Sequence, residues 1–150
     1  MKEKLYIAYG SNMNIGQMAR RCPTAKVVGN LLLKGQELWF YGSRNNAVAT
    51  IEPSSDGAVP VTLWSITPED EASLDRYEGY PHLYRKEYMI FPYNGKSISA
   101  MVYIMNTENC SYGSPTQSYY ETILEGYNSA GFHPKLLHKA LERTIMKMIF

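Results

Sequence analysis

The sequence predicts an α+β fold, with a small, mixed, barrel-like sheet of six to seven strands and helices packed around its rim. Short runs rich in β-branched and aromatic residues dominate the pattern. Most of the helical signals, given by capping residues and a helical spacing of apolar residues, come later in the chain. An order in which the strands come first and most of the helices later is typical of α+β proteins rather than of a regular βαβ alternation. No repeat, linker or low-complexity run interrupts the 150 residues, so we expect a single domain over 1–150.

The strand-like runs cover 5–9, 26–33, 37–41, 47–51, 59–66, 84–91 and 98–105. Their β-branched and aromatic residues favour extended backbone. The densest cluster of turn-forming residues, 52–57, lies between the fourth and fifth runs. Pro60 cannot donate a hydrogen bond to a ladder, which indicates an edge, a bulge or the true start of the fifth strand.

Capping residues predict the first two helices. Asn14 begins a short helix over about 15–22. Thr67, placed before a proline and a run of acids, begins a second helix over about 68–78. Gly79 ends this second helix, because glycine readily adopts the left-handed conformation found after helix ends.

Two further helices are predicted near the end of the sequence. Ser114 stands before a proline, which repeats the capping pattern and predicts a helix over about 115–128. The last helix is expected from about Pro134. Its apolar face consists of Leu137, Leu141, Ile145 and Met148.

Composition excludes several classes of protein. Fifteen Lys and Arg against fourteen Asp and Glu give a net charge of +1, and the basic residues are scattered, so we expect no nucleic-acid partner. A mean hydropathy of −0.32 and the lack of a long apolar run predict no membrane segment. Cys22 and Cys110 lie far apart without ligand-like neighbours, which predicts neither a metal site nor a disulfide framework. This cysteine usage leads us to expect a reduced, cytoplasmic protein. The apolar run at the N-terminus is shorter than the core of a secretory signal, and we interpret it as a first strand.

The first candidate site is Tyr9-Gly10-Ser11-Asn12, which leaves a predicted strand and enters a capped helix. Glycine permits a positive φ and a close approach of the backbone to a ligand. Consecutive N–H groups in such a turn can converge on a carboxylate or an oxyanion. A plain turn followed by a helix cap explains the same spacing, so the pattern alone leaves both interpretations open.

The second candidate is Glu78, in the last turn of the predicted second helix. Leu74, Tyr77 and Glu78 share one helix face, so we expect the glutamate to point toward the core. Burial and the negative end of the helix dipole would both raise its pKa. A glutamate with a raised pKa can accept a proton and later return it. The alternative is a solvated acid that pairs with Arg76 or Arg85.

Together these segments resemble the γ-glutamylcyclotransferase-like family, in order and over nearly the whole chain. The opening strand with 9–12 is similar to the family's ligand-binding loop, and 74–79 is similar to the segment that holds its catalytic glutamate. Ala49-Thr50-Ile51 followed by 59–66 resembles its central hairpin. The spacing of its tyrosine-bearing helix is kept by Pro115, Tyr119, Ile123 and Gly126, with Thr116 where serine is usual.

The resemblance implies a cyclotransferase that converts a γ-glutamyl amine or γ-glutamyl amino acid into 5-oxoproline and a free amine. It implies that Glu78 acts as the general base and then as the general acid, and that the reaction requires no cofactor or metal. The implied substrate-binding residues are Tyr9, Gly10, Ser11, Asn12 and Tyr119. The implied partner is the small γ-glutamyl substrate, and a monomer or a homodimer is expected. The alternative is a non-catalytic binding module for a small γ-glutamyl-like carboxylate.

Two residues bear on substrate choice. Val61 stands where the family commonly has a glycine, so the approach of a ligand to that strand is expected to be narrower or re-routed. Arg85 follows the Glu78 segment closely and is a candidate cation for a substrate carboxylate, although a surface arginine beside a strand is the commoner arrangement.

Overall fold

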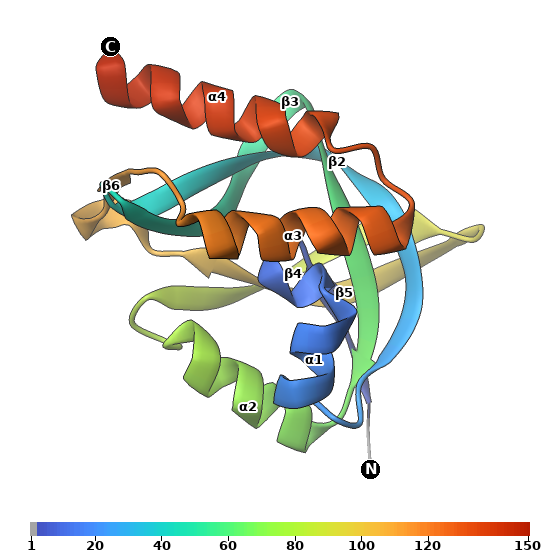
Figure 1. The fold of residues 1–150 in the computed structure, drawn as a ribbon. Helices are drawn as coiled ribbons and strands as arrows, with labels where there is room; N and C mark the ends of the chain where they lie inside the picture. The colour runs from blue at the N-terminus through green and yellow to red at the C-terminus, as the bar shows by residue number, and fades with distance from the viewer. Residues whose placement is uncertain (1–2) are drawn as a thin grey trace.

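The computed structural model describes residues 3–150 and shows a six-stranded mixed sheet that curls into a half-barrel with helices around it (Figure 1). The predicted α+β class is therefore confirmed. The order across the sheet is β4-β5-β1-β3-β2-β6. The strands are β1 (Lys4–Ala8), β2 (Lys26–Ser43), β3 (Asn46–Ile66), β4 (Tyr84–Tyr93), β5 (Lys96–Met105) and β6 (Ser111–Tyr112).

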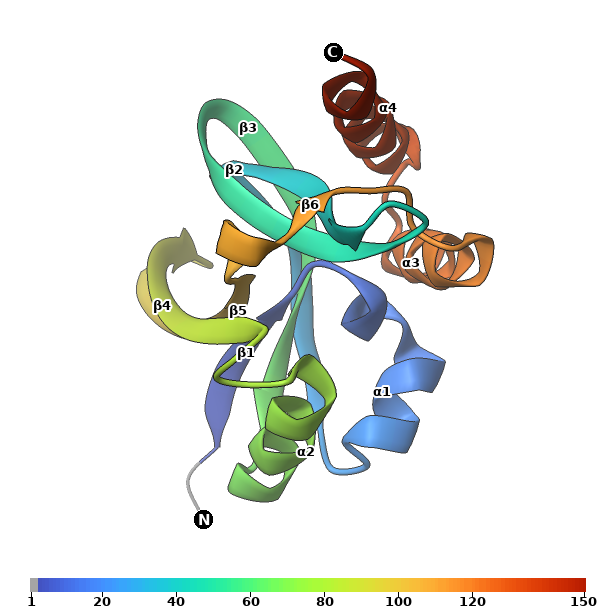
Figure 2. The ribbon, with the colours of Figure 1, turned by 90° about the vertical axis from the view of Figure 1, so that its left-hand side faces the viewer.

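The first strand lies in the middle of the sheet. β1 runs antiparallel to β3, with Tyr6 opposite Trp64. On its other side β1 runs parallel to β5, where Tyr6 pairs with Met101. The segment that follows β1 therefore leaves the sheet at its centre, between β3 and β5 (Figure 2).

The strands β2 and β3 are longer than the sequence predicts. Runs 26–33 and 37–41 are parts of the single strand β2, and the next two runs are parts of β3. The register shifts between Lys34 and Gln36, so the turn-forming residues 52–57 lie at an irregularity within β3 rather than between two strands. The interpretation of 52–57 as a break was wrong, because a continuous partner strand keeps both sides of the irregularity paired.

The helices are α1 (Ile15–Arg21), α2 (Pro68–Glu78), α3 (Gln117–Ala130) and α4 (Lys135–Ile149), with 3₁₀ turns η1 (Ser11–Met13) and η2 (Thr107–Asn109). The Thr67 side chain accepts from the N–H of Asp70, and the Asp70 carboxylate accepts from the N–H of Thr67. This reciprocal capping box fixes the start of α2, as the sequence predicts.

The start of α3 differs from the prediction. The Thr116 side chain, and not that of Ser114, caps the helix by accepting from the N–H of Tyr119 at 3.2 Å. Ser114 is unsuited to this role because its backbone extends the sheet. Its N–H donates to the carbonyl of Arg44 and its carbonyl accepts from Ala47.

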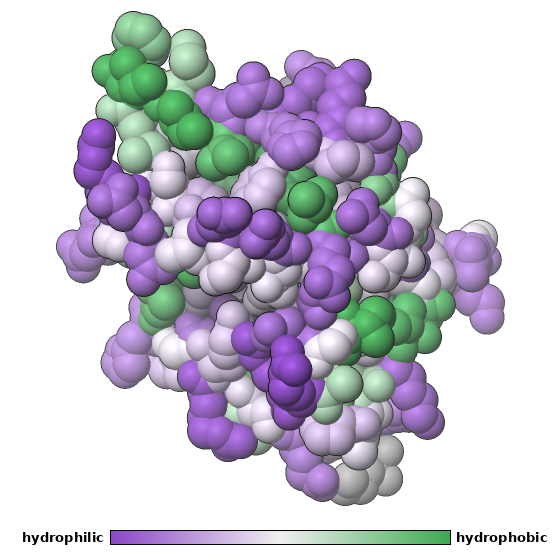
Figure 3. Space-filling model, in the orientation of Figure 1, coloured by the Kyte–Doolittle hydropathy of each residue, from purple (hydrophilic) through white to green (hydrophobic). Residues whose placement is uncertain are grey.

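The last helix packs against β2. The hydroxyl of Thr144, which is fully buried, accepts from the N–H of Phe40 at 3.2 Å. Of the predicted apolar face, Leu137 is fully buried. The C-terminal end of α4 leaves Ile149 and Phe150 exposed, where Figure 3 shows an apolar area. None of the helices in 3–150 is long and apolar enough to span a membrane.

Candidate active site

A cavity of about 90 Å³, partly open to solvent, lies where the centre of the half-barrel meets the ends of α2 and α3. It is lined by every residue that the resemblance assigns to the site: Tyr9, Gly10, Ser11, Asn12, Glu78 and Tyr119. It is also lined by Ala49 and Tyr77, which the sequence analysis named without a site role, and by five residues that it did not name: Tyr6, Val48, Leu83, Tyr84 and Tyr103. The fold thus brings together segments that are far apart in the sequence.

Glu78 is the last residue of α2, and its carboxyl group opens into the cavity. Gly79 follows in the left-handed conformation, with φ 64°, and ends the helix there. No other residue in 3–150 forms a hydrogen bond or an ion pair with this carboxyl group under ordinary distance limits. Burial raises the pKa of Glu78 from 4.5 to about 7, and the positive charge of Arg21 opposes this rise in part.

Neither expected arginine pairs with Glu78. Arg76 donates to the hydroxyl of Ser73, on its own helix. The Arg85 guanidinium contacts Glu87 at 2.7 Å, and Arg85 is absent from the cavity lining, so it supplies no cation here. Tyr77, which shares a helix face with Glu78, lies at the cavity with 43% of its surface exposed rather than in the core.

The loop after β1 presents backbone donors to the cavity. Gly10 has φ −123°, so the loop does not use the positive φ that glycine permits. A Cβ atom built there would lie 3.4 Å from both the Tyr119 hydroxyl and the Ala49 Cβ, in ordinary van der Waals contact with the cavity wall. In η1 the N–H groups of Ser11 and Asn12 have no acceptor among the described residues. Free N–H groups at a helical N-terminus are suited to an anionic oxygen.

Tyrosine side chains form much of the cavity wall. The Tyr119 hydroxyl accepts from the N–H of Ala49 at 3.1 Å, and the Tyr84 hydroxyl donates to the carbonyl of Ala49 at 2.6 Å. The Tyr9 hydroxyl donates to the carbonyl of Tyr103 at 2.6 Å. Burial raises the pKa of Tyr9, Tyr84 and Tyr119 above the ordinary tyrosine value. These hydroxyls therefore stay protonated at neutral pH, where the carboxyl group of Glu78 titrates.

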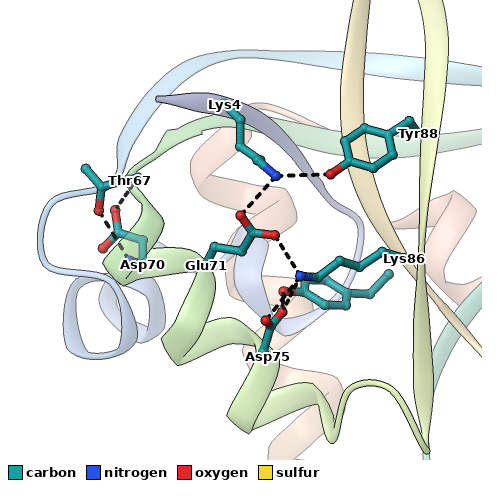
Figure 4. A network of polar contacts seen from close by, with 8 residues as sticks. Lys4, Thr67, Asp70, Glu71, Asp75, Lys86 and Tyr88 are labelled. Carbon is teal, nitrogen blue, oxygen red and sulfur yellow. Dashed lines mark hydrogen bonds and ion pairs between the residues drawn. The ribbon is translucent and has the colours of Figure 1, made fainter. Parts of the chain in front are cut away.

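A polar network anchors α2 beside the cavity (Figure 4). The Glu71 carboxylate contacts the ammonium groups of Lys4 at 3.0 Å and Lys86 at 2.7 Å. Lys86 also reaches Asp75 at 3.0 Å, and the Tyr103 hydroxyl donates to Asp75 at 2.6 Å. The network joins α2 to β1, β4 and β5, and so fixes the helix that ends in the glutamate.

The sequence held only a general signal for the missed residues. Thirteen tyrosines are unusually many for 150 residues and suit a pocket with orienting hydroxyls, but Tyr6, Tyr84 and Tyr103 lie on three separate strands. Their convergence depends on the strand order, which no local pattern reveals. Val61 is fully buried and does not line the cavity, so it does not narrow this site directly.

The described part of the chain offers no cluster of three or more His, Cys, Asp or Glu side chains that could hold a metal ion. Cys22 and Cys110 are both free thiols. The candidate site combines a carboxyl group titrating near neutral pH, two backbone N–H groups without an acceptor among the described residues, and several protonated tyrosines, all at one cavity.

This arrangement has the components of an acid–base site for a small ligand, on a half-barrel scaffold. The sequence matches the family described as "Gamma-glutamyl cyclotransferase, AIG2-like" over residues 6–124. The chain belongs to this family.

Similar solved structures are consistent with this family. A protein described as gamma-glutamyl cyclotransferase has 25% sequence identity and a TM-score of 0.80, over 93% of this chain and 86% of its own. An uncharacterized protein from Homo sapiens has 26% identity and a TM-score of 0.80, over 93% and 87% of the two chains. A yeast gamma glutamyl cyclotransferase specific to glutathione shares the fold, with 11% identity and a TM-score of 0.63 over 98% and 97%. A comparison with curated protein sequences gives no match.

Proposed function

We propose that the protein is a cyclotransferase that converts a γ-glutamyl amine or γ-glutamyl amino acid into 5-oxoproline and a free amine. The observation that carries the proposal is the carboxyl group of Glu78, which has no hydrogen-bond or ion-pair partner among residues 3–150, lines the cavity and has a pKa of about 7. A group with such a pKa can both take and return a proton near neutral pH. Membership of the family and the structural likeness to a gamma-glutamyl cyclotransferase support the same reaction.

The proposed reaction begins with proton transfer from the α-ammonium group of the substrate to the Glu78 carboxylate. The neutral amine attacks the γ-amide carbonyl carbon and closes a five-membered ring, with negative charge on the former carbonyl oxygen. The carbonyl then re-forms, the C–N bond to the departing amine breaks, and Glu78 gives its proton to that nitrogen. The ring nitrogen still carries a second proton, which it transfers to the regenerated Glu78 carboxylate. Glu78 passes this proton to the released amine, which leaves as an ammonium ion, and Glu78 ends ionised as it began.

Two other elements have roles in this proposal. The free N–H groups of Ser11 and Asn12 suit either the substrate carboxylate or the oxyanion, both of which are anionic. The Tyr119 hydroxyl accepts from Ala49, so its own proton is available for donation to the substrate. Both elements stabilise charge without a change in protonation.

The test is release of free amine and 5-oxoproline from γ-glutamyl amino acids, γ-glutamylamines and glutathione, followed by mass spectrometry. An α-glutamyl dipeptide is the matched substrate control, because its amide carbonyl cannot close the same ring with release of the amine. We expect Glu78→Gln to lower kcat toward the upper end of roughly 10²–10⁴-fold, because one residue serves both proton transfers. Exposed Glu125→Gln, on α3, is the matched protein control.

Turnover by Glu78→Gln close to that of the wild type would remove Glu78 from the mechanism. Circular dichroism establishes that each variant is folded. If the wild type binds 5-oxoproline, measured by calorimetry, but cleaves none of the γ-glutamyl compounds, the binding-module interpretation replaces the enzyme.

A further inference from the structure

Arg21 lies just outside the cavity and has no role in the reaction as proposed above. It is the last residue of α1, and its guanidinium carbon lies 3.4 Å from the centroid of the Tyr77 ring. One guanidinium nitrogen donates to the side-chain oxygen of Asn12 at 2.6 Å. Both contacted residues, Asn12 and Tyr77, line the cavity.

The two contacts close a ring of interactions at the cavity. The Tyr77 hydroxyl lies 3.1 Å from the Ser11 hydroxyl, and Ser11 precedes Asn12 in the loop that carries the free N–H groups. Arg21 therefore connects α1, the loop after β1 and the last turn of α2. Removal of its side chain would leave the Tyr77 ring without its cation and the Asn12 oxygen without its donor.

Asn12 is the member of this ring that needs a fixed orientation. Its side-chain nitrogen donates to the Tyr6 hydroxyl at 3.0 Å, and its backbone carbonyl accepts from the indole of Trp64 at 3.0 Å. The residue is 3% exposed, so an unpaired amide oxygen here would be costly. The bond from Arg21 thus defines which way the Asn12 amide faces.

We propose that Arg21 is a positioning residue of this site, which holds the Asn12 loop and the Tyr77 ring in place and provides a fixed positive charge beside the cavity. The inference deepens the proposed cyclotransferase function and rests on it. The planar guanidinium suits the position, since it can stack on a ring and donate in its own plane at once. A lysine ammonium keeps the charge but has no planar face for stacking.

The charge has a direct consequence for Glu78. Burial raises the pKa of that carboxyl group, and Arg21 is the cation that opposes the rise. The other titratable side chains that line the cavity are tyrosines. Tyr77 lies on α2 itself, and the others lie on β1, the loop after it, β4, β5 and α3: Tyr6, Tyr9, Tyr84, Tyr103 and Tyr119. Without Arg21, Glu78 would hold its proton to higher pH, so a smaller fraction of it would be the proton-accepting carboxylate at neutral pH.

Arg21→Gln and Arg21→Lys test the proposal, with Arg20→Gln as the matched control. Arg20 is exposed on the same helix, one residue away, and carries the same charge. We measure kcat and KM from pH 5.5 to 9 on a γ-glutamyl compound that the wild type cleaves. We also follow the Glu78 carboxyl carbon by ¹³C NMR titration, assigned with Glu78→Gln, which requires no substrate.

For Arg21→Gln we expect the acid-side midpoint of the kcat profile and the NMR titration to move upward by about half to one pH unit. We expect KM to rise about tenfold, because Asn12 and Tyr77 lose their common partner. Arg21→Lys should keep the pH midpoint of the wild type, because the charge remains. Its KM should lie between those of the wild type and Arg21→Gln. Arg20→Gln should match the wild type in every measurement.

The proposal is overturned if Arg21→Gln and Arg20→Gln have the same midpoint in the kcat profile, the same NMR titration of Glu78 and the same KM. If the glutamine variant does not fold, an unchanged KM in Arg21→Lys overturns it instead. The NMR titration separates this inference from the proposed function. A wild type that releases no 5-oxoproline defeats the function, while the effect of Arg21 on Glu78 is still measured.

Discussion

Replacing Glu78 with glutamine should stabilise the protein at alkaline pH, besides removing the proposed catalytic group. The pKa of Glu78 rises from 4.5 in an ordinary glutamate to about 7 in the folded protein. At about 1.36 kcal/mol per pH unit, this rise corresponds to about 3 kcal/mol. Glutamine has no proton to lose, so it escapes the cost of holding a buried charge.

The pH dependence follows from the direction of the shift. Below pH 4.5 the carboxyl group is protonated in both the folded and the unfolded chain, so it contributes no difference. Between pH 4.5 and about 7 the unfolded chain loses its proton first, and the free energy of unfolding of the wild type falls. Well above pH 7 the carboxyl group is ionised in both the folded and the unfolded chain, so the loss in free energy of unfolding no longer changes with pH. The free energy of unfolding of Glu78→Gln should therefore equal that of the wild type at pH 4 and exceed it by about 3 kcal/mol at pH 8.

Urea denaturation at pH 4, 5.5 and 8 measures this difference for the wild type, Glu78→Gln and the exposed control Glu125→Gln. A difference between Glu78→Gln and the wild type that is the same at all three pH values would contradict the argument. So would an equal pH-dependent gain in the control, since that would reflect net charge rather than burial. A confirmed gain would mean that the site keeps a destabilising carboxylate in exchange for its chemistry.

The remaining predictions concern the cavity wall and the packing of α3. Tyr119→Phe should cost about 1–3 kcal/mol in urea denaturation, because it leaves the N–H of Ala49 without its acceptor, and it should weaken 5-oxoproline binding in calorimetry. Unchanged stability would show that water replaces the hydroxyl. Gly126→Ala should cost about 1–3 kcal/mol in the same assay, since the new Cβ would lie 2.9 Å from the Cβ of Met13 and 3.0 Å from its carbonyl carbon. An unchanged free energy of unfolding in Gly126→Ala would show that the loop after β1 shifts readily to accommodate the new Cβ atom.

Local signals predicted the helices better than the strands. The Thr67 cap and Gly79 mark both ends of α2, because a capping side chain and a left-handed residue act within a few positions of the helix itself. The irregularity in β3 at 52–57 has the composition of a turn, and only its pairing with β2 shows that the strand continues. Pairing between distant segments is not encoded in any short window.

The same division applies to the site. The position of Glu78 at a helix end beside Leu74 predicted a carboxyl group with a raised pKa, and burial raises it. Arg21 went unnoticed because it looks like an ordinary basic residue in the last turn of a short helix. Its contact with Tyr77, 56 positions later in the sequence, exists only after α1 and α2 pack together.

The central position of β1 constrains the order in which the chain can fold. β2 and β3 are neighbours in sequence and can form their ladder early, whereas β1 needs partners near residues 62–66 and 101. During synthesis the N-terminal strand must therefore wait until β5 has emerged before both its edges are satisfied. The loop carried by β1 would then be among the last parts to become ordered, and pulse-labelled amide exchange during refolding would detect this as late protection of β1 relative to β2 and β3.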